Sequence, residues 1–384
     1  MTRRNAIVAA LLLLCMIHPA WAAVIFNGIA APLSTGSITL SNPSDVAVDP
    51  TGNIFIADTS NNQIVEVSPS GTSSVLSITG LSPALSAPIG VAIDGSGDLL
   101  IADSGNSRIV EVTPAGAGSA VSTSSVTLSS PKGVVVDRSG NIYIADTGNN
   151  QIVQVTSAGA ASVFFSSATL ISSVALSGPS GLTVDTSGNL YVADSGNNRL
   201  VEITAAASGS VVSTASLGTP LSNPTGVALD YLGNIFIADQ GNNRVVIIPV
   251  GQSATPYTTG SLTVTSPTGV SVDASGTVYI ADTTGNRIVS DMNSVVGFGH
   301  LALGVTSGTV LTLPFSVDNA TTLGSIKVAT SGAPPSISPW VVAPPVPREP
   351  RTQLAPSLSS FCPPRQVSVS EPWCSMITVA RNSL

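Results

Sequence analysis

The sequence predicts an all-β protein, a six-bladed β-propeller with four antiparallel strands in each blade. One segment, Pro-x-Gly-Val-x-Val-Asp-x-x-Gly-Asn-Ile-Tyr-Ile-Ala-Asp-x-x-Asn-Asn-Arg-Ile-Val, occurs six times in similar form. Successive copies begin 43 to 48 residues apart, within the repeat length of about 40–50 residues that is typical of propeller blades. No segment after residue 22 has a helical period of apolar residues. The copies begin at Pro43, Pro88, Pro131, Pro179, Pro224 and Pro267.

Each copy contains the elements of one blade. In the copy that begins at Pro179, apolar and small residues alternate over short segments, and Gly, Ser and Asn fill the turns between them. A single four-stranded sheet cannot bury both of its faces, so six sheets packed in a ring form the core together. The four expected strands, from the innermost to the outermost, are residues 181–185, 189–194, 199–203 and 209–213.

The ring has to close through the sixth blade, whose third strand lies at residues 287–290. We expect residues 23–28, an apolar segment ahead of the first copy, to form the outer strand of this blade. Such closure joins the two ends of the propeller and removes two open sheet edges. The alternative is that residues 295–298 complete the blade.

Two aspartates recur in every copy, and recurrence in all blades indicates a structural role. We expect the first to accept hydrogen bonds inside its own turn. We expect the second to pair with the downstream arginine or with turn amides. The first aspartates are Asp49, Asp94, Asp137, Asp185, Asp230 and Asp273, and the second are Asp58, Asp103, Asp146, Asp194, Asp239 and Asp282.

The run Asp-x-x-Gly-Asn-Ile-Tyr-Ile-Ala-Asp-x-x-Asn-Asn-Arg-Ile-Val resembles the NHL repeat over residues 40–291. The resemblance implies a six-bladed propeller, and it implies a fold rather than one activity, because NHL propellers serve in protein or RNA binding, extracellular sensing and lyase chemistry. The chain departs from the pattern at Asp45, where the other copies have Gly, and at Gln63 and Gln151, where the other copies have Arg. Asp98 and Thr277 replace a turn asparagine.

Candidate binding residues lie where each copy enters its innermost strand, at one mouth of the central channel. The residue after the first proline of the copy varies, and a variable ring at a channel mouth suits ligand specificity. Asp45 is a carboxylate one position further on, and Lys132 is one of two lysines in the chain; it could pair with Asp45 or with a ligand carboxylate. The candidate ligand-binding residues are Ser44, Asp45, Ile89, Lys132, Ser180, Thr225 and Thr268.

Catalytic residues are scarce in the repeats. The two histidines, His18 and His300, and the three cysteines lie outside residues 40–291, so a zinc site, a histidine base and a thiol nucleophile have no candidates there. We therefore predict no catalytic residues and no cofactor. The alternative of a divalent cation such as calcium, held by oxygen ligands in the channel, stays open. Such an ion would fit a gluconolactonase-like or streptogramin-lyase-like hydrolase or lyase.

Charge argues against a nucleic-acid partner. The chain has a net charge of −8, and its repeats contain five arginines and one lysine. An acidic surface repels phosphate. We expect a monomer that binds a protein, peptide or glycan ligand, with no membrane span.

The segments outside the repeats suggest export. The basic start Met1-Thr-Arg-Arg4, the apolar run 6–17 and Ala20-Trp-Ala22 form a signal-peptide pattern with cleavage after Ala22, which predicts a periplasmic, extracellular or surface location. The expected domains are therefore a signal peptide at 1–22, the propeller at 23–296, a truncated immunoglobulin-like segment at 297–333 and a disordered tail at 334–384. A frame change near residues 334–340 would explain this tail; otherwise Cys362 and Cys374 could form a disulfide.

Together these observations predict an exported propeller that acts as a protein- or ligand-binding scaffold through its channel mouth. The alternative is the metal-dependent hydrolase or lyase, with oxygen ligands in the central channel.

Overall fold

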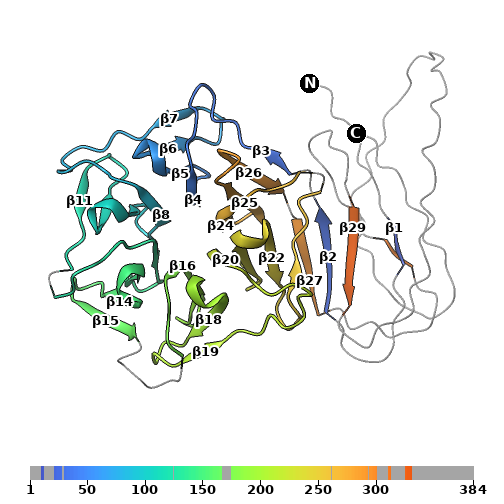
Figure 1. Ribbon diagram of the computed structural model, residues 1–384. Coiled ribbons are helices and arrows are strands. Elements are labelled where there is room, and N and C mark those ends of the chain that lie inside the picture. Colours follow the sequence, from blue (N-terminus) through green and yellow to red (C-terminus); the bar gives the residue numbers. More distant parts are fainter. Residues whose placement is uncertain are drawn as a thin grey trace, which may run out of the picture. The chain divides into compact units, whose positions relative to one another are not determined.

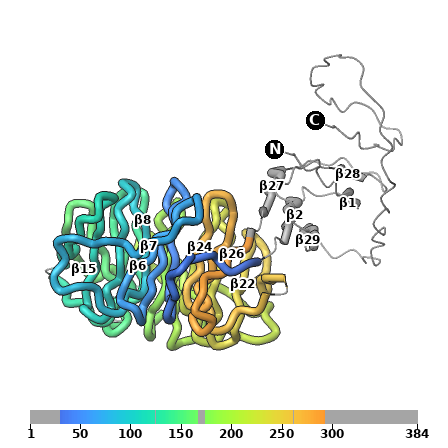
Figure 2. Tube along the Cα trace, turned by 90° about the horizontal axis from the view of Figure 1, so that it is seen from above, coloured from blue at the N-terminus to red at the C-terminus, as the bar shows by residue number. Residues whose placement is uncertain are grey.

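A computed structural model describes residues 30–292, apart from 124, 167–173 and 261, and the backbone of short strands outside that range. The chain divides into two compact units, and the larger, Ala22–Phe298 with Thr321–Ala329, contains the propeller. Six four-stranded antiparallel sheets surround a common axis (Figure 1). Seen from the side, the ring is a flat disc (Figure 2). The predicted fold class is confirmed.

The strands follow the expected order from the axis outwards. Blades one to three are β4 (Pro43–Val48), β5 (Ile54–Asp58), β6 (Gln63–Val67) and β7 (Ser73–Val75); β8 (Pro88–Ile93), β9 (Leu99–Asp103), β10 (Arg108–Val112) and β11 (Gly118–Ala120); and β12 (Gly133–Val136), β13 (Ile142–Asp146), β14 (Gln151–Val155) and β15 (Ala161–Ser166). Blades four to six are β16 (Pro179–Val184), β17 (Leu190–Asp194), β18 (Arg199–Ile203) and β19 (Gly209–Val211); β20 (Pro224–Leu229), β21 (Ile235–Asp239), β22 (Arg244–Ile248) and β23 (Thr255–Pro256); and β24 (Pro267–Val272), β25 (Thr277–Asp282), β26 (Arg287–Met292) and β3 (Ala31–Pro32).

The core consists of six apolar clusters, one between each pair of neighbouring blades. Between blades four and five, for example, Leu200 packs with Ile237 and Val246, all of which are buried. Val, Ile, Leu and Ala supply nearly all of the buried hydrophobic side chains. Each blade therefore has two buried faces, which explains why its central strands are apolar on both sides and do not alternate with polar residues.

The ring closes from the N-terminal side, but not through the predicted residues. β3 pairs antiparallel with β26, with Pro32 opposite Val289. Residues 23–27 belong to β2 (Trp21–Asn27), which pairs with β27 (Ser294–His300) and β29 (Ser325–Thr330), so the expectation for 23–28 was wrong and so was the alternative at 295–298. Residues 21–27 are already paired with β27 and β29, which leaves β3 to complete the sixth blade. Residues 33–42 then join β3 to β4, the same length as residues 257–266 between β23 and β24, and the corresponding links in the other blades have 12 residues.

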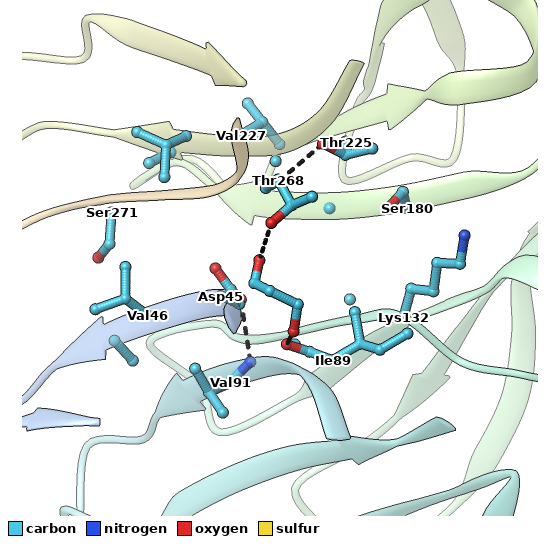
Figure 3. Close-up of a pocket in the computed structure, with 18 of the residues that line it drawn as sticks. Asp45, Val46, Ile89, Val91, Lys132, Ser180, Thr225, Val227, Thr268 and Ser271 are labelled. Carbon is cyan, nitrogen blue, oxygen red and sulfur yellow. Dashed lines mark hydrogen bonds between the residues drawn. The ribbon is translucent and has the colours of Figure 1, made fainter. Parts of the chain in front are cut away.

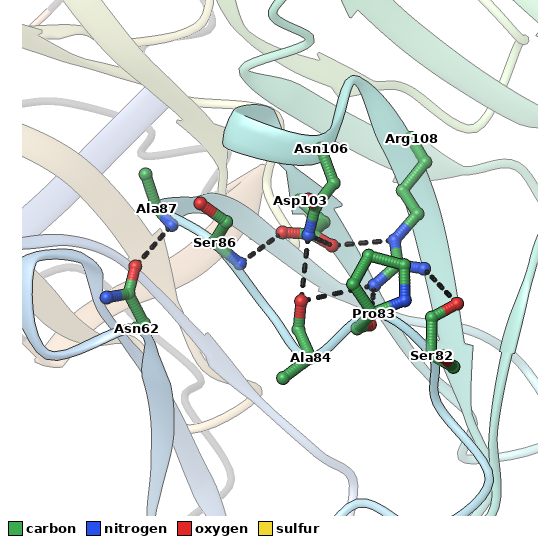
Figure 4. Close-up of polar contacts among 9 residues, drawn as sticks. All are labelled: Asn62, Ser82, Pro83, Ala84, Ser86, Ala87, Asp103, Asn106 and Arg108. Atoms are coloured by element: carbon green, nitrogen blue, oxygen red, sulfur yellow. Dashed lines mark hydrogen bonds and ion pairs between the residues drawn. The ribbon is translucent and has the colours of Figure 1, made fainter.

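The second aspartate of each repeat is fully buried and holds its blade together. Figure 4 shows the network of blade two, in which the backbone N–H of Ser86 donates to Oδ1 of Asp103 at 2.7 Å. Its Oδ2 accepts from Nδ2 of Asn106 at 2.8 Å and from Nε of Arg108 at 2.7 Å. Gln63 and Gln151 make the same bond through Nε2 in blades one and three. The prediction that this aspartate pairs with the downstream arginine or turn amides is confirmed.

The first aspartate of each repeat stabilises the turn after the innermost strand. Oδ1 of Asp49 accepts the backbone N–H groups of Thr51 and Asn53, each at 2.8 Å, and its Oδ2 accepts Nδ2 of Asn53 at 2.7 Å. Equivalent bonds to Oδ1 recur at Asp94, Asp137, Asp185, Asp230 and Asp273. The structural role predicted for these residues is therefore confirmed.

A polar residue in the left-handed region ties each blade to the next. In five blades it is an asparagine, with φ between 49° and 54°, whose Oδ1 accepts a backbone N–H of the following blade at 2.6 to 2.8 Å. Blade two has Ser107 in the same conformation, and its Oγ accepts from Ser130 at 3.3 Å. Ser107 is therefore the weakest link in this series.

Ser107→Asn should stabilise the propeller by about 0.5–1 kcal/mol, because asparagine tolerates a positive φ and would make the shorter bond to the Ser130 amide. Chemical denaturation measures the change. Ser107→Ala, which removes only the long contact, is the control and should alter stability by less than about 0.5 kcal/mol. An asparagine variant no more stable than the wild type would contradict this account of the blade link.

Several predictions lie outside the described residues. These are the signal peptide, the immunoglobulin-like segment and the tail. Outside the propeller, the structure describes the backbone of β2, β27 and β29, in the order β27–β2–β29, and of β1 (Ala10–Leu12) paired with β28 (Val310–Thr312). Among the described residues, no helix is both long and apolar enough to cross a membrane.

Candidate functional site

The innermost strands approach one another so closely that five of them need glycine at the same position. A Cβ on Gly133 would lie 2.3 Å from the carbonyl oxygen of Ser180, and one on Gly181 would lie 2.5 Å from that of Thr225. Such contacts are far below van der Waals distance, so a larger residue would force the strands apart. The ring comprises Gly90, Gly133, Gly181, Gly226 and Gly269.

Blade one places Asp45 at the sixth position of this glycine ring. Its Cα and Oδ1 lie against Gly269, where a Cβ would be only 2.6 and 2.5 Å away. The backbone N–H of Val91 in the next blade donates to Oδ2 at 3.1 Å. Burial raises the pKa of Asp45 to about 7, and the amides of Val91 and Val46 partly oppose that shift. The channel wall thus carries a carboxyl group that titrates near neutral pH.

A cavity of about 600 Å³ occupies the axis of the propeller. This volume lies within the range of about 300–1,000 Å³ that is common for small-molecule sites. Its deeper wall is apolar and includes Val46, Val91 and Val227 (Figure 3). All seven of the predicted channel-mouth residues line it: Ser44, Asp45, Ile89, Lys132, Ser180, Thr225 and Thr268.

Half of the variable ring is engaged in joining blades. Oγ of Ser44 donates to the carbonyl oxygen of Ile89 at 2.8 Å. Oγ1 of Thr225 donates to the carbonyl oxygen of Thr268 at 2.9 Å, and Oγ1 of Thr268 donates to that of Ser44 at 2.8 Å. These three hydroxyls from blades five, six and one therefore have a structural role that the sequence reasoning missed.

The other half of the ring, from blades two, three and four, is differently placed. Ile89, Lys132 and Ser180 line the same cavity, and the described structure records no hydrogen bond from their side chains (Figure 3). Ser180 is buried, whereas Lys132 is half-buried. Because these side chains are not used to join blades, they are the ring members best able to contact a ligand.

Lys132 and Asp45 do not pair with each other. The four ion pairs found among the described residues each join an arginine to the second aspartate of its own repeat. Figure 3 shows the ammonium group of Lys132 well apart from the Asp45 carboxylate. The suggested Lys132–Asp45 pair is therefore wrong, and the alternative of a ligand carboxylate stays a prediction.

The cavity is poorly suited to hold a metal ion. Its lining contains a single carboxylate, Asp45, and no histidine or cysteine. Calcium takes about six to eight oxygen ligands and zinc about four, so one carboxylate cannot supply either site. The lining hydroxyls of blades five, six and one already donate to neighbouring carbonyl groups.

Three carboxylates do converge elsewhere, in blade two. Oxygens of Asp94, Asp98 and Glu111 lie within 4.8 Å of one another, and each residue is partly exposed. Burial and then the charge of Asp94 raise the pKa of Asp98; burial and then the charges of Asp98 and Asp94 raise the pKa of Glu111. None of the three lines the axial cavity. The sequence signal was available at Asp98, which replaces the asparagine found in four of the other five turns.

Comparisons with known proteins agree with this fold. Residues 39–290 match the family described as the virginiamycin B lyase family. Among solved structures, a gluconolactonase from Xanthomonas campestris is 15% identical (TM-score 0.55, 73% of this chain, all of that chain). An auxiliary nutrient binding protein from Bacteroides ovatus is 14% identical (TM-score 0.55, 71% and 76%).

A third structure is a virginiamycin B lyase from Staphylococcus aureus with quinupristin, 17% identical (TM-score 0.51, 67% and 82%). It is described as catalytically inactive after replacement of a histidine by alanine. A comparison with curated proteins gave no significant match. At these identities the solved structures establish the fold alone, and the NHL resemblance of the repeats stays a prediction.

Proposed function

The chain belongs to the virginiamycin B lyase family, and from that premise we propose that it is an exported propeller that binds a ligand in its axial cavity. One observation carries this proposal. The variable ring opens onto a cavity of about 600 Å³, and three of its side chains, Ile89, Lys132 and Ser180, are not used to join blades. The propeller supplies a rigid rim, and these three side chains supply recognition.

Lyase chemistry is supported less well than binding. The inactive relative lacks a histidine, and residues 30–292 of this chain contain no histidine and no cysteine. A general base would have to be Asp45, and its pKa near 7 would suit that role. However, no second acid, base or electrophilic group lines the cavity except Lys132. Family membership still favours a hydrolase or lyase as the second candidate function.

Metal content distinguishes a binding propeller from a hydrolase or lyase, because the hydrolase or lyase is the function that was predicted to use a divalent ion. We expect purified protein to contain less than one equivalent of calcium or zinc by elemental mass spectrometry. We also expect its melting temperature to be unchanged by a chelator. One tightly held equivalent, with a lower melting temperature after chelation, would instead favour the hydrolase or lyase.

Two variants would then locate such an ion. Asp45→Asn should release an ion held in the channel, whereas Asp98→Asn should release one held by the blade-two carboxylates. Ligand binding itself can be followed by the shift in melting temperature across a peptide and glycan panel. A ligand at about 100 times its dissociation constant stabilises the folded state by about 2.7 kcal/mol.

A further inference from the structure

Two residues of opposite charge, Asp45 and Lys132, are the charged members of the cavity lining. Asp45 comes from β4 in blade one, and Lys132 immediately precedes β12 in blade three. Every ion pair recorded among the described residues involves other side chains, so neither charge has an ionic partner in that part of the chain. A cavity with one unpaired charge of each sign is electrostatically complementary to a ligand that also carries both signs.

The two charges come from neighbouring positions of the repeat. Asp45 belongs to the narrow glycine ring, while Lys132 stands one residue earlier in its repeat, in the variable ring at the rim. Figure 3 shows the two side chains apart from each other. A ligand that meets both therefore needs its charged groups apart, with the positive group at the glycine ring and the negative group at the variable ring.

The cavity lining around Asp45 and Lys132 favours a ligand whose middle part is apolar. Ile89 lies beside Lys132 on the rim, and Val46, Val91 and Val227 line the deeper wall. Such walls accept small aliphatic side chains, and the volume suits a molecule of a few amino acids. Glycans fit this lining less well because their many hydroxyl groups would face valine side chains without hydrogen-bond partners.

We infer that the cavity selects short aliphatic peptides with both termini free, the ammonium group at Asp45 and the carboxylate at Lys132. This inference rests on the proposed function and names its ligand class. Charge pairing at Lys132 favours a free C-terminus, and pairing at Asp45 favours a free N-terminus.

Binding should also be linked to protons. Burial raises the pKa of Asp45 to about 7, so part of the population is protonated at neutral pH. An ammonium group favours the ionised carboxylate, so binding should release protons and strengthen as the pH rises from 6 to 7. Above about pH 7.5 the peptide's own α-ammonium group, with a pKa of about 8, begins to lose its proton and this gain should level off. Lys132 is the other titratable side chain in the lining.

Calorimetric titration with the tripeptide Ala-Val-Ala tests the inference. The uncapped peptide should bind about five- to tenfold more tightly than its N-acetylated or C-amidated form, because each cap removes one charge pair. Lys132→Met should remove the preference for a free C-terminus and leave the preference for a free N-terminus. Asp45→Asn should do the opposite and also abolish proton release. Arg138→Met, which removes an exposed positive charge from the same blade, should change neither preference.

The outcomes separate the ligand class from the function. Equal affinity for capped and uncapped peptide would overturn the inference while leaving a binding propeller. Peptides that fail to bind while a glycan or neutral ligand does bind in the cavity would overturn it as well. If no member of the peptide and glycan panel binds, the proposed function fails together with the inference.

Discussion

Replacing Asp239 by alanine should destabilise the propeller by about 3–5 kcal/mol, the cost expected when one partner of a buried charge network is removed. Asp239 has no exposed surface. Its Oδ1 accepts the backbone N–H of Ser222 at 2.7 Å, and its Oδ2 accepts Nδ2 of Asn242 at 2.8 Å and Nε of Arg244 at 2.6 Å. Alanine would leave these donors without their acceptor and open a small cavity between strands.

Denaturation in urea, followed by circular dichroism, measures this loss. Glu202→Ala is the control, because it removes a carboxylate from a partly exposed position on a neighbouring blade. We expect it to change stability by less than about 0.5 kcal/mol. Asp239→Asn keeps the shape of the side chain but weakens the bond to Arg244, so its loss should be intermediate. An alanine variant that loses under about 1 kcal/mol would show that the network is not what holds the blade together.

Removing the carboxyl group of Asp291 should have the opposite effect and stabilise the protein at neutral pH. Asp291 is fully buried on β26, and it occupies the position that Val67, Val112 and Val155 fill in other blades. Its Oδ2 accepts a hydrogen bond from Tyr257 at 3.0 Å, whereas its Oδ1 has no hydrogen-bond partner among the described residues. Burial raises the pKa of Asp291 to about 6, and the Tyr257 hydroxyl opposes that shift.

The sign of the pH dependence follows from this raised pKa. Between about pH 4 and pH 6 the folded state holds a proton that the unfolded state has released, so stability falls as the pH rises through that window. At pH 7.5 we expect Asp291→Val to be more stable than the wild type by about 1–2 kcal/mol, allowing for structural relaxation and water penetration. Denaturation at pH 4.5 and pH 7.5 measures both values.

Asp291→Asn is the matched control, because it keeps the acceptor for Tyr257 and cannot titrate. It should lose the fall in stability between pH 4 and pH 6. If the asparagine variant keeps the wild-type pH profile, Asp291 is not the titrating group and the prediction is wrong.

Much of the site was predictable because residues at the same position of each repeat lie in one ring around the propeller axis. Ser44, Ile89 and Lys132 share one repeat position, and the structure brings them to one cavity. What the repeat could not show is which members of the ring bond across blades. Ser44 uses its hydroxyl in this way, whereas the described structure records no bond from the hydroxyl of Ser180, and that difference depends on the neighbouring carbonyl group and not on the repeat itself.

Asp291 shows a signal that was available in the sequence and was missed. Aligning its position with the buried Val67 and Ile203 of other repeats would have exposed a carboxylate in an apolar core position.

The sequence by itself determined the number of blades, the strand order and the structural role of both repeat aspartates. It could do so because each blade is built from contacts between residues close in the chain, which a repeat records directly. The tertiary structure alone decided that Asp45 is an acid with a raised pKa in a glycine ring, that Lys132 lies apart from it, and that Asp94, Asp98 and Glu111 converge. These features depend on how strands approach in space, and desolvation and Coulomb interactions act over those distances and not along the chain.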